Sequence, residues 1–188
     1  MRIIFESNKV AAAAIAMSNE STRYNLNGVF FQDGHAVATD GQLMTVAKTN
    51  GELRKDLVEQ VNVPADGAIM PISTKALTAM KKKTADYVIF ENDMLTVKTE
   101  YDQPLHIEES RPIDGRFPNW KAVIDQNEYD NAPGAFKGKL LDRIAKTSAA
   151  LGSIGEAVRI TGESPTNAHR VNYGKQTDVY SVVMPIRD

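Results

Sequence analysis

The chain contains no cysteine, which excludes disulfide bonds and thiolate metal sites and fits a reducing compartment. Histidine is also scarce. His35, His106 and His169 lie far apart without the i, i+4 spacing of a helical metal site, so we expect no metal and no cofactor. No apolar run approaches the roughly 20 residues that span a bilayer, and residues 1–7 lack the features of a signal peptide. These absences together predict a cytoplasmic protein.

Signatures of catalysis are equally sparse. Glu108 and Glu109 are adjacent, so their side chains point to opposite faces of a strand and are poorly placed for joint acid–base work. The segment 152–155 lacks the lysine of a phosphate-binding loop and is typical of a helix C-terminus. The sequence contains no nucleophile elbow. It therefore predicts a protein that is not an enzyme, with the 42% hydrophobic and 24% charged residues of an ordinary globular chain.

One order of elements recurs along the 188 residues: a strand, a helix and a three-strand meander. The first copy predicts a strand at 2–7, a helix at 8–19 and strands at 27–32, 35–40 and 43–48. The second predicts a strand at 68–71, a helix at 73–83 with Ser73 as N-cap, and strands at 86–91, 94–99 and 104–109. The third follows a polar linker at 125–133 and has no leading strand: a helix at 137–151 precedes strands at 156–162, 168–173 and 178–184. The pattern is that of an α+β protein.

Three separated segments carry a more specific signal. They are Arg23-Tyr24-Asn25-Leu26-Asn27-Gly28 with Val37-Ala38-Thr39-Asp40-Gly41, then Asp114-Gly115-Arg116-Phe117-Pro118, then Val182-Val183-Met184-Pro185-Ile186-Arg187. Each alone is explained as a turn or a strand end. In this order they resemble the bacterial sliding clamp family, the DNA polymerase III beta subunit. That family closes a ring around duplex DNA and tethers polymerases and repair proteins to it.

The resemblance implies the DNA-clamp fold, with sheets outside and helices lining a DNA channel. Residues 1–124 resemble the complete middle domain of the bacterial clamp, and residues 134–188 resemble the second half of its last domain. The family's first domain and the first half of its last domain have no counterpart, so the chain is expected to cover about half of a family member. The family's closed ring has six domains of two strand-helix-meander units each, hence twelve units. Twelve units divide into four chains of three, with the third unit of each chain pairing with a neighbouring chain. We therefore expect a homo-oligomer, with a tetrameric ring as the simplest closed form and a packed dimer or open arc as alternatives.

The resemblance also implies a groove for the short linear motifs of partner proteins. The matching positions are Leu26, Thr39, Gly41, Met44, Pro118, Val123, Val182 and Met184. Small and apolar side chains suit a concave apolar cleft, and methionines provide adaptable walls. The alternative is that these are ordinary core residues of strands. The chain departs from the family at Gln42-Leu43, where a basic pair is common, and at the terminal Asp188, where a hydrophobic residue is common.

Basic residues concentrate on the three predicted helices, although the whole chain carries a net charge of −2. They are Lys9, Lys75, Lys81, Lys82, Lys83, Lys137, Lys139, Arg143 and Lys146. With Asp142 these helices carry +8, which leaves −10 for the rest of the chain. Basic helices on an acidic body suit phosphate binding that is independent of base sequence. The alternative is that these lysines occupy solvated helix faces, where lysine is common.

Two hypotheses about function follow. In the first, the protein is a sliding clamp and polymerase processivity factor. Its partners are then double-stranded DNA, a DNA polymerase, other proteins with clamp-binding motifs and a clamp loader. In the second, it is an adaptor or decoy that keeps the peptide groove without encircling DNA. The basic helices favour the clamp, whereas the short length keeps the decoy open.

Overall fold

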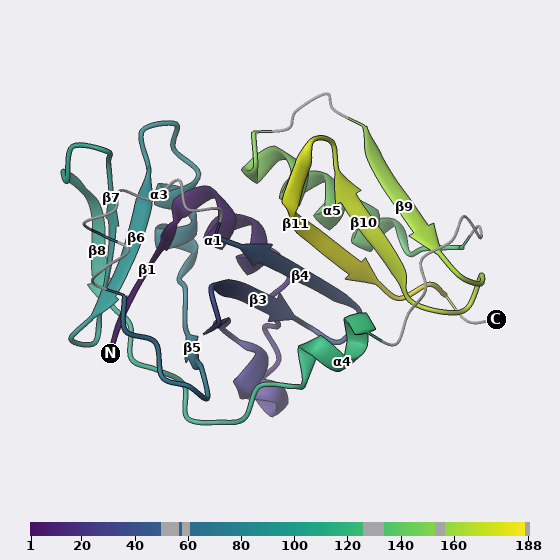
Figure 1. Cartoon of the computed structure of the whole chain (residues 1–188), viewed down its shortest axis with the longest axis horizontal. Coiled ribbons are helices and arrows are strands. Elements are labelled where there is room, and N and C mark those ends of the chain that lie inside the picture. Colours follow the sequence, from purple (N-terminus) through teal and green to yellow (C-terminus); the bar gives the residue numbers. More distant parts are fainter. Residues whose placement is uncertain (50–56, 58–60, 126–133, 153–156, 187–188) are drawn as a thin grey trace.

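The computed structural model describes residues 1–49, 57, 61–125, 134–152 and 157–186, and it contains two antiparallel sheets (Figure 1). The four-stranded sheet has the order β1 (Arg2–Glu6), β6 (Tyr87–Glu91), β7 (Met94–Lys98), β8 (Pro104–Glu109). The seven-stranded sheet has the order β5 (Ala68–Met70), β2 (Val29–Gln32), β3 (His35–Thr39), β4 (Leu43–Lys48), β11 (Gln176–Val183), β10 (His169–Tyr173), β9 (Val158–Gly162). Every strand predicted from the sequence is present among them, with ends that differ by up to two residues.

Three helices lie together against the sheets: α1 (Ser7–Ala14), α3 (Thr74–Met80) and α5 (Gly138–Ala150). α1 packs against both α3 and α5 and covers β3 and β4 (Figure 1). Two shorter elements were not predicted, the 3-10 helix η1 (Ser21–Leu26) and α4 (Trp120–Asp125). Among the described residues, no helix is long and apolar enough to cross a membrane.

The first two units exchange their leading strands. β1 precedes the first meander in sequence but pairs with β6 of the second, over Arg2↔Glu91 to Glu6↔Tyr87. β5 precedes the second meander but pairs with β2 of the first. Each sheet therefore contains chain from both units, so neither unit can complete its sheet without the other.

Local turn chemistry sets the hairpin registers. The turn between β2 and β3 holds Asp33 and Gly34 at φ 49° and 70°, and the turn between β6 and β7 holds Asn92 and Asp93 at φ 50° and 59°. These are residue types that accept positive φ and match the twist of a two-residue hairpin. Ser73 is the N-cap of α3 as predicted, because its hydroxyl accepts a hydrogen bond from the Ala76 N–H at 3.1 Å.

The helix predicted at 8–19 is shorter than expected and ends at Ala14. The guanidinium of Arg143 on α5 donates from Nε and Nη2 to the carbonyl of Ile15, at 3.1 and 2.9 Å. A partner from a distant helix thus satisfies a carbonyl at the C-terminus of α1. The four alanines at 11–14 are buried, so the Ala-rich segment allows α1 to approach the sheet and both neighbouring helices closely.

The third unit joins the first within the same chain. β11 pairs with β4 over Val179↔Ala47 to Val183↔Leu43, and α5 packs against α1. One edge of this unit is thus covered within the chain, because the last strand of its meander pairs with β4, whereas its other edge strand, β9, has no strand partner on its outer side among the described residues. The predicted linker at 125–133 lies outside the described residues except for Asp125, which ends α4.

The β4–β11 joint contains buried hydroxyl groups. Thr45 and Ser181 are fully buried and their hydroxyl oxygens lie 2.7 Å apart, and the Tyr173 hydroxyl lies 2.6 Å from that of Ser181. Burial raises the pKa of Tyr173 to about 12, although hydrogen bonds with Ser181 and Thr147 act in the opposite direction. The three buried hydroxyl groups therefore hydrogen-bond to one another across β4, β10 and β11, which are strands from distant parts of the sequence.

Candidate functional site

Three of the predicted groove residues form a row across neighbouring strands. Thr39 on β3 lies opposite Met44 on β4, and Met44 lies opposite Val182 on β11. The Thr39 hydroxyl donates to the Leu43 carbonyl at 2.9 Å and accepts from the Gly41 N–H at 3.0 Å. The Asp40-Gly41 turn is thereby held at the end of this row.

The row belongs to an apolar cluster on the sheet face away from α1, α3 and α5. Leu26, Met44 and Val182 are buried in it, and Met184 packs against it with a half-buried side chain. The structure thus brings together Leu26, Thr39, Met44, Val182 and Met184, which come from three distant segments of the sequence. Most of these side chains are nearly buried, so they form a floor, whereas Met184 remains accessible.

The other three predicted residues lie around this cluster. Gly41 is exposed at φ 88°, a conformation that favours glycine. Pro118 is exposed in the segment before α4, and Val123 on α4 is 40% exposed. Neither Pro118 nor Val123 belongs to the buried cluster, so α4 and its preceding segment form an accessible border beside the floor.

Two aromatic residues that were not predicted complete the cluster. Phe117 stacks on Phe30 with ring centroids 4.7 Å apart, and Trp120 packs beside His35 with centroids 5.1 Å apart. Both side chains are buried. Trp120 is the chain's single tryptophan and lies two residues after the Asp114–Pro118 motif, which is a signal that could have placed it in the site. These rings fix α4 against the sheet.

A cavity of about 910 Å³ borders this segment. Its walls come from residues 112–121, from Phe30 and Gln32 on β2, and from the turn that leads into β5. Of the eight predicted groove residues, only Pro118 lines it. This cavity therefore does not coincide with the predicted peptide groove.

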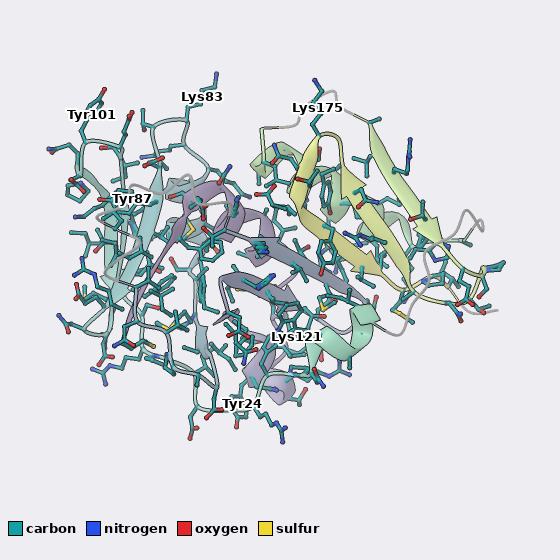
Figure 2. The ribbon with its side chains drawn as sticks, in the orientation of Figure 1. Tyr24, Lys83, Tyr87, Tyr101, Lys121 and Lys175 are labelled. Carbon is teal, nitrogen blue, oxygen red and sulfur yellow. The ribbon has the colours of Figure 1, made fainter. Side chains whose placement is uncertain are left out.

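Seven of the predicted basic residues lie exposed on or beside the outer helices. They are Lys75, Lys81, Lys82 and Lys83 on and after α3, and Lys137, Lys139 and Lys146 at and along α5. Figure 2 shows Lys83 extending away from the ribbon. The pKa of Lys81 is lowered by partial burial and by the positive charge of Lys146, so the basic ends of α3 and α5 come close to each other. We call these seven residues the lysine row.

Two predicted DNA contacts are corrected by the structure. The side chain of Lys9 is only 3% exposed; its ammonium group forms an ion pair with Asp178 on β11 and donates to the Lys48 carbonyl at 2.8 Å. Arg143 is 13% exposed, forms an ion pair with Asp40 and binds the Ile15 carbonyl. Both cations therefore join the third unit to the first and are not exposed to a phosphate backbone.

The Asp40 carboxylate is held in its charged form by the same contact. Burial alone would raise the pKa of Asp40, but the backbone N–H groups of Leu43 and Gln42 and the Arg143 guanidinium together lower it. Asp40 thus links the turn beside the apolar cluster to α5. Among the described residues, no group of three or more His, Asp or Glu side chains could hold a metal ion.

The architecture has the DNA-clamp fold, as its similarity to solved structures shows. Over its whole length the chain matches a DnaN sliding clamp from Bartonella birtlesii bound to griselimycin, with a TM-score of 0.65 and 15% identity. It also matches the DNA polymerase III beta chain of Streptococcus pneumoniae TIGR4, with a TM-score of 0.63 and 15% identity, and the beta sliding clamp of C. crescentus, with a TM-score of 0.58 and 20% identity. No family model and no curated protein matches the sequence.

The chain is shorter than the clamps that it matches. It spans 66%, 65% and 66% of those three chains, just under two thirds and more than the half expected from the sequence. The resemblance to the bacterial DNA polymerase III beta subunit is therefore confirmed at the level of the fold, in a shortened form.

Proposed function

We propose that this protein is a sliding clamp and polymerase processivity factor that holds duplex DNA through the lysine row. The observation that carries the proposal is the exposure of all seven lysines of the lysine row on or beside α3 and α5, although the chain is acidic overall. Like charges held close repel each other, and a polyanion relieves that repulsion. The contact is expected to be independent of base sequence, and the protein carries out no reaction of its own.

Charge reversal at the lysine row tests this proposal. The triple variant Lys81→Glu, Lys82→Glu, Lys83→Glu is expected to lose at least about tenfold in affinity for duplex DNA at moderate salt, with a shallower salt dependence. The matched control is Lys48→Glu, Lys98→Glu, Lys175→Glu, which changes the net charge equally on two strands and a hairpin turn. Equal losses in both variants would show that overall charge, and not the lysine row, drives binding.

A comparison of circular with linear duplex DNA distinguishes encirclement from surface binding. A closed ring stays on circular duplex after a salt wash but leaves linear duplex through the open ends. We therefore expect gel-filtration retention on circular DNA only, in the presence of a clamp loader if the ring must be opened. If retention is the same on both forms at every salt concentration, the protein binds DNA without enclosing it.

We also propose that the apolar cluster binds the clamp-binding motifs of a polymerase and other partners. The buried floor of Leu26, Met44 and Val182 beside the accessible Met184 supports an apolar anchor site. Gln42-Leu43 at the adjacent turn favours a set of partners different from that of clamps with a basic pair there.

The substitution Met184→Asp tests the peptide site. A carboxylate placed against apolar groups is costly, so affinity for a labelled clamp-binding peptide should fall by at least about tenfold in fluorescence polarization. Met94→Asp is the matched control, because Met94 is 38% exposed on the other sheet and its loss should leave binding unchanged. Equal peptide affinity of Met184→Asp and wild type would remove this site from the proposal.

A homo-oligomeric ring remains the assembly that we propose for encirclement, with four chains as the simplest closed form. The adaptor or decoy is the second candidate, and the observation that favours it is that the chain spans just under two thirds of the clamps it matches. A chain that binds the peptide but is not retained on circular DNA supports the decoy.

A further inference from the structure

Two sheet edges stay open in the described part of the chain. β8 ends the four-stranded sheet and β9 ends the seven-stranded sheet. The opposite ends have cover, because Arg2 on β1 forms a bridge with Asn62 and the Ile69 carbonyl on β5 accepts from the Ile113 N–H. An open edge presents unpaired N–H and C=O groups to another strand.

The open edge of β8 is of the same kind as the two edges that already pair in this chain. β4, β8 and β11 are each the last strand of a meander, and β4 pairs with β11. In that joint the facing residues Met44 and Val182 both point their side chains away from the helices. Residues that face each other across an antiparallel joint point their side chains to the same face of the joined sheet. The helices of the two joined parts therefore lie on one face only if the facing residues of both strands point away from their own helices.

The hydrogen-bond pattern places Ile107 as the equivalent residue on β8. The Ser110 N–H donates to the Asp93 carbonyl, so the alternate pair Leu95 and Glu108 is also hydrogen-bonded, and the backbone groups of Ile107 point outward. Leu95 lies in the helix-side core, and Ile107 therefore points its side chain away from the helices. This is the arrangement of Met44 on β4.

The edge of β9 has the opposite arrangement. The Gly174 N–H donates to the Ala157 carbonyl, so the backbone groups of Val158 and Ile160 point outward. Those two side chains pack against the helix-side core. An antiparallel joint between β8 and β9 would consequently place the helices of the two chains on opposite faces of the sheet.

The side chains of β8 also suit pairing with a second β8. Antiparallel pairing centred on Ile107 places this side chain, which is 56% exposed, against Ile107 of the second chain. It also places His106 opposite Glu108 of the second chain, and these two residue types already lie within 2.8 Å of each other on one β8. Facing side chains that can hydrogen-bond to each other stabilise a strand pair, whereas like charges directly opposite would destabilise it.

We propose that β8 pairs with β8 of a second copy of this chain around a twofold axis at Ile107. The two four-stranded sheets then become one continuous sheet with the helices of both chains on the same side. This inference goes beyond the proposed function, because it specifies a symmetric joint and does not depend on DNA or peptide binding. A ring built with this joint must alternate it with a second joint at the third unit.

Cysteine cross-linking tests the joint directly, because the chain has no cysteine of its own. Residues that face each other as a hydrogen-bonded antiparallel pair have Cα atoms about 5.5 Å apart, within the range that a disulfide spans. Ile107→Cys should therefore form a disulfide-linked dimer under mild oxidation without DNA. Arg159→Cys, exposed on the other open edge, is the matched control and should cross-link at least about tenfold more slowly, as random collision predicts.

A proline variant supplies a second measurement. The Ile107 N–H points outward, so Ile107→Pro removes a donor to the second chain without removing one from the β7–β8 ladder. In light scattering at micromolar concentration, wild type should be dimeric or larger and Ile107→Pro should shift to smaller species with unchanged circular dichroism. Three results would overturn the proposal. They are a monomeric wild type, equal cross-linking rates for Ile107→Cys and Arg159→Cys, and disulfides that form only when the two cysteine variants are mixed. DNA retention is scored on the lysine variants, so the two proposals can fail separately.

Discussion

Replacing Lys9 with methionine is expected to lower the free energy of unfolding by about 3 kcal/mol, as for breaking a buried ion pair from one side. The Lys9 side chain is 3% exposed and that of Asp178 is 17% exposed, so removal of the ammonium leaves a carboxylate largely shielded from water. The Lys48 carbonyl also loses its 2.8 Å donor. Denaturant unfolding followed by circular dichroism measures the loss.

The double variant Lys9→Met, Asp178→Leu is the control for this result. Removing both charges should restore part of the stability, because Asp178 is no longer an unpaired charge, whereas the buried Glu6 carboxylate, 3.5 Å from the Lys9 ammonium in wild type, still loses its cation. If Lys9→Met is as stable as wild type but binds DNA more weakly, Lys9 is exposed to phosphate and its assignment to the joint between α1 and β11 is wrong.

Replacing Trp120 with alanine is expected to cost about 3–4 kcal/mol of stability, the range for deleting a large buried aromatic side chain. Trp120 is 5% exposed in the cluster with Phe117 and Met44, and it holds α4 on the sheet. The indole N–H has no hydrogen-bond partner among the described residues, so the contribution of this side chain comes from packing.

Trp120→Phe is the matched comparison. It keeps an aromatic ring and loses no hydrogen bond, so it should cost only about 1–2 kcal/mol. Thermal unfolding by circular dichroism, which needs no tryptophan signal, compares the two variants. Equal losses for alanine and phenylalanine would indicate that the indole N–H has an essential partner.

Local rules predicted much of this fold. The Ser73 cap and the Asp33-Gly34 turn depend on residues close in sequence, so their chemistry can be read directly. Met44 and Val182 were placed in one site through the resemblance, and they do face each other across the β4–β11 joint. The strand exchange between β1 and β5 could not be predicted, because both pairings satisfy the same local pattern.

The errors have a common physical cause. Lys9 and Arg143 were predicted to bind DNA from their charge and helical position, but the acids that pair with them, Asp178 and Asp40, lie on distant strands. Only the tertiary arrangement shows which cations are already neutralised inside the protein. Trp120 was missed because a single aromatic residue has no periodic pattern, and its position just after the Asp114–Pro118 motif was its only mark in the sequence.

The β4–β11 pairing has a consequence for synthesis on the ribosome. Leu43 and Val183 face each other, so β4 emerges long before the strand that covers it. Until β11 has been translated, the nascent chain carries an uncovered edge at β4 and a Thr45 hydroxyl without its Ser181 partner. Contacts between such distant segments form slowly, and an uncovered edge invites pairing with other chains. The speed of translation between β4 and β11 is therefore expected to influence the yield of soluble protein.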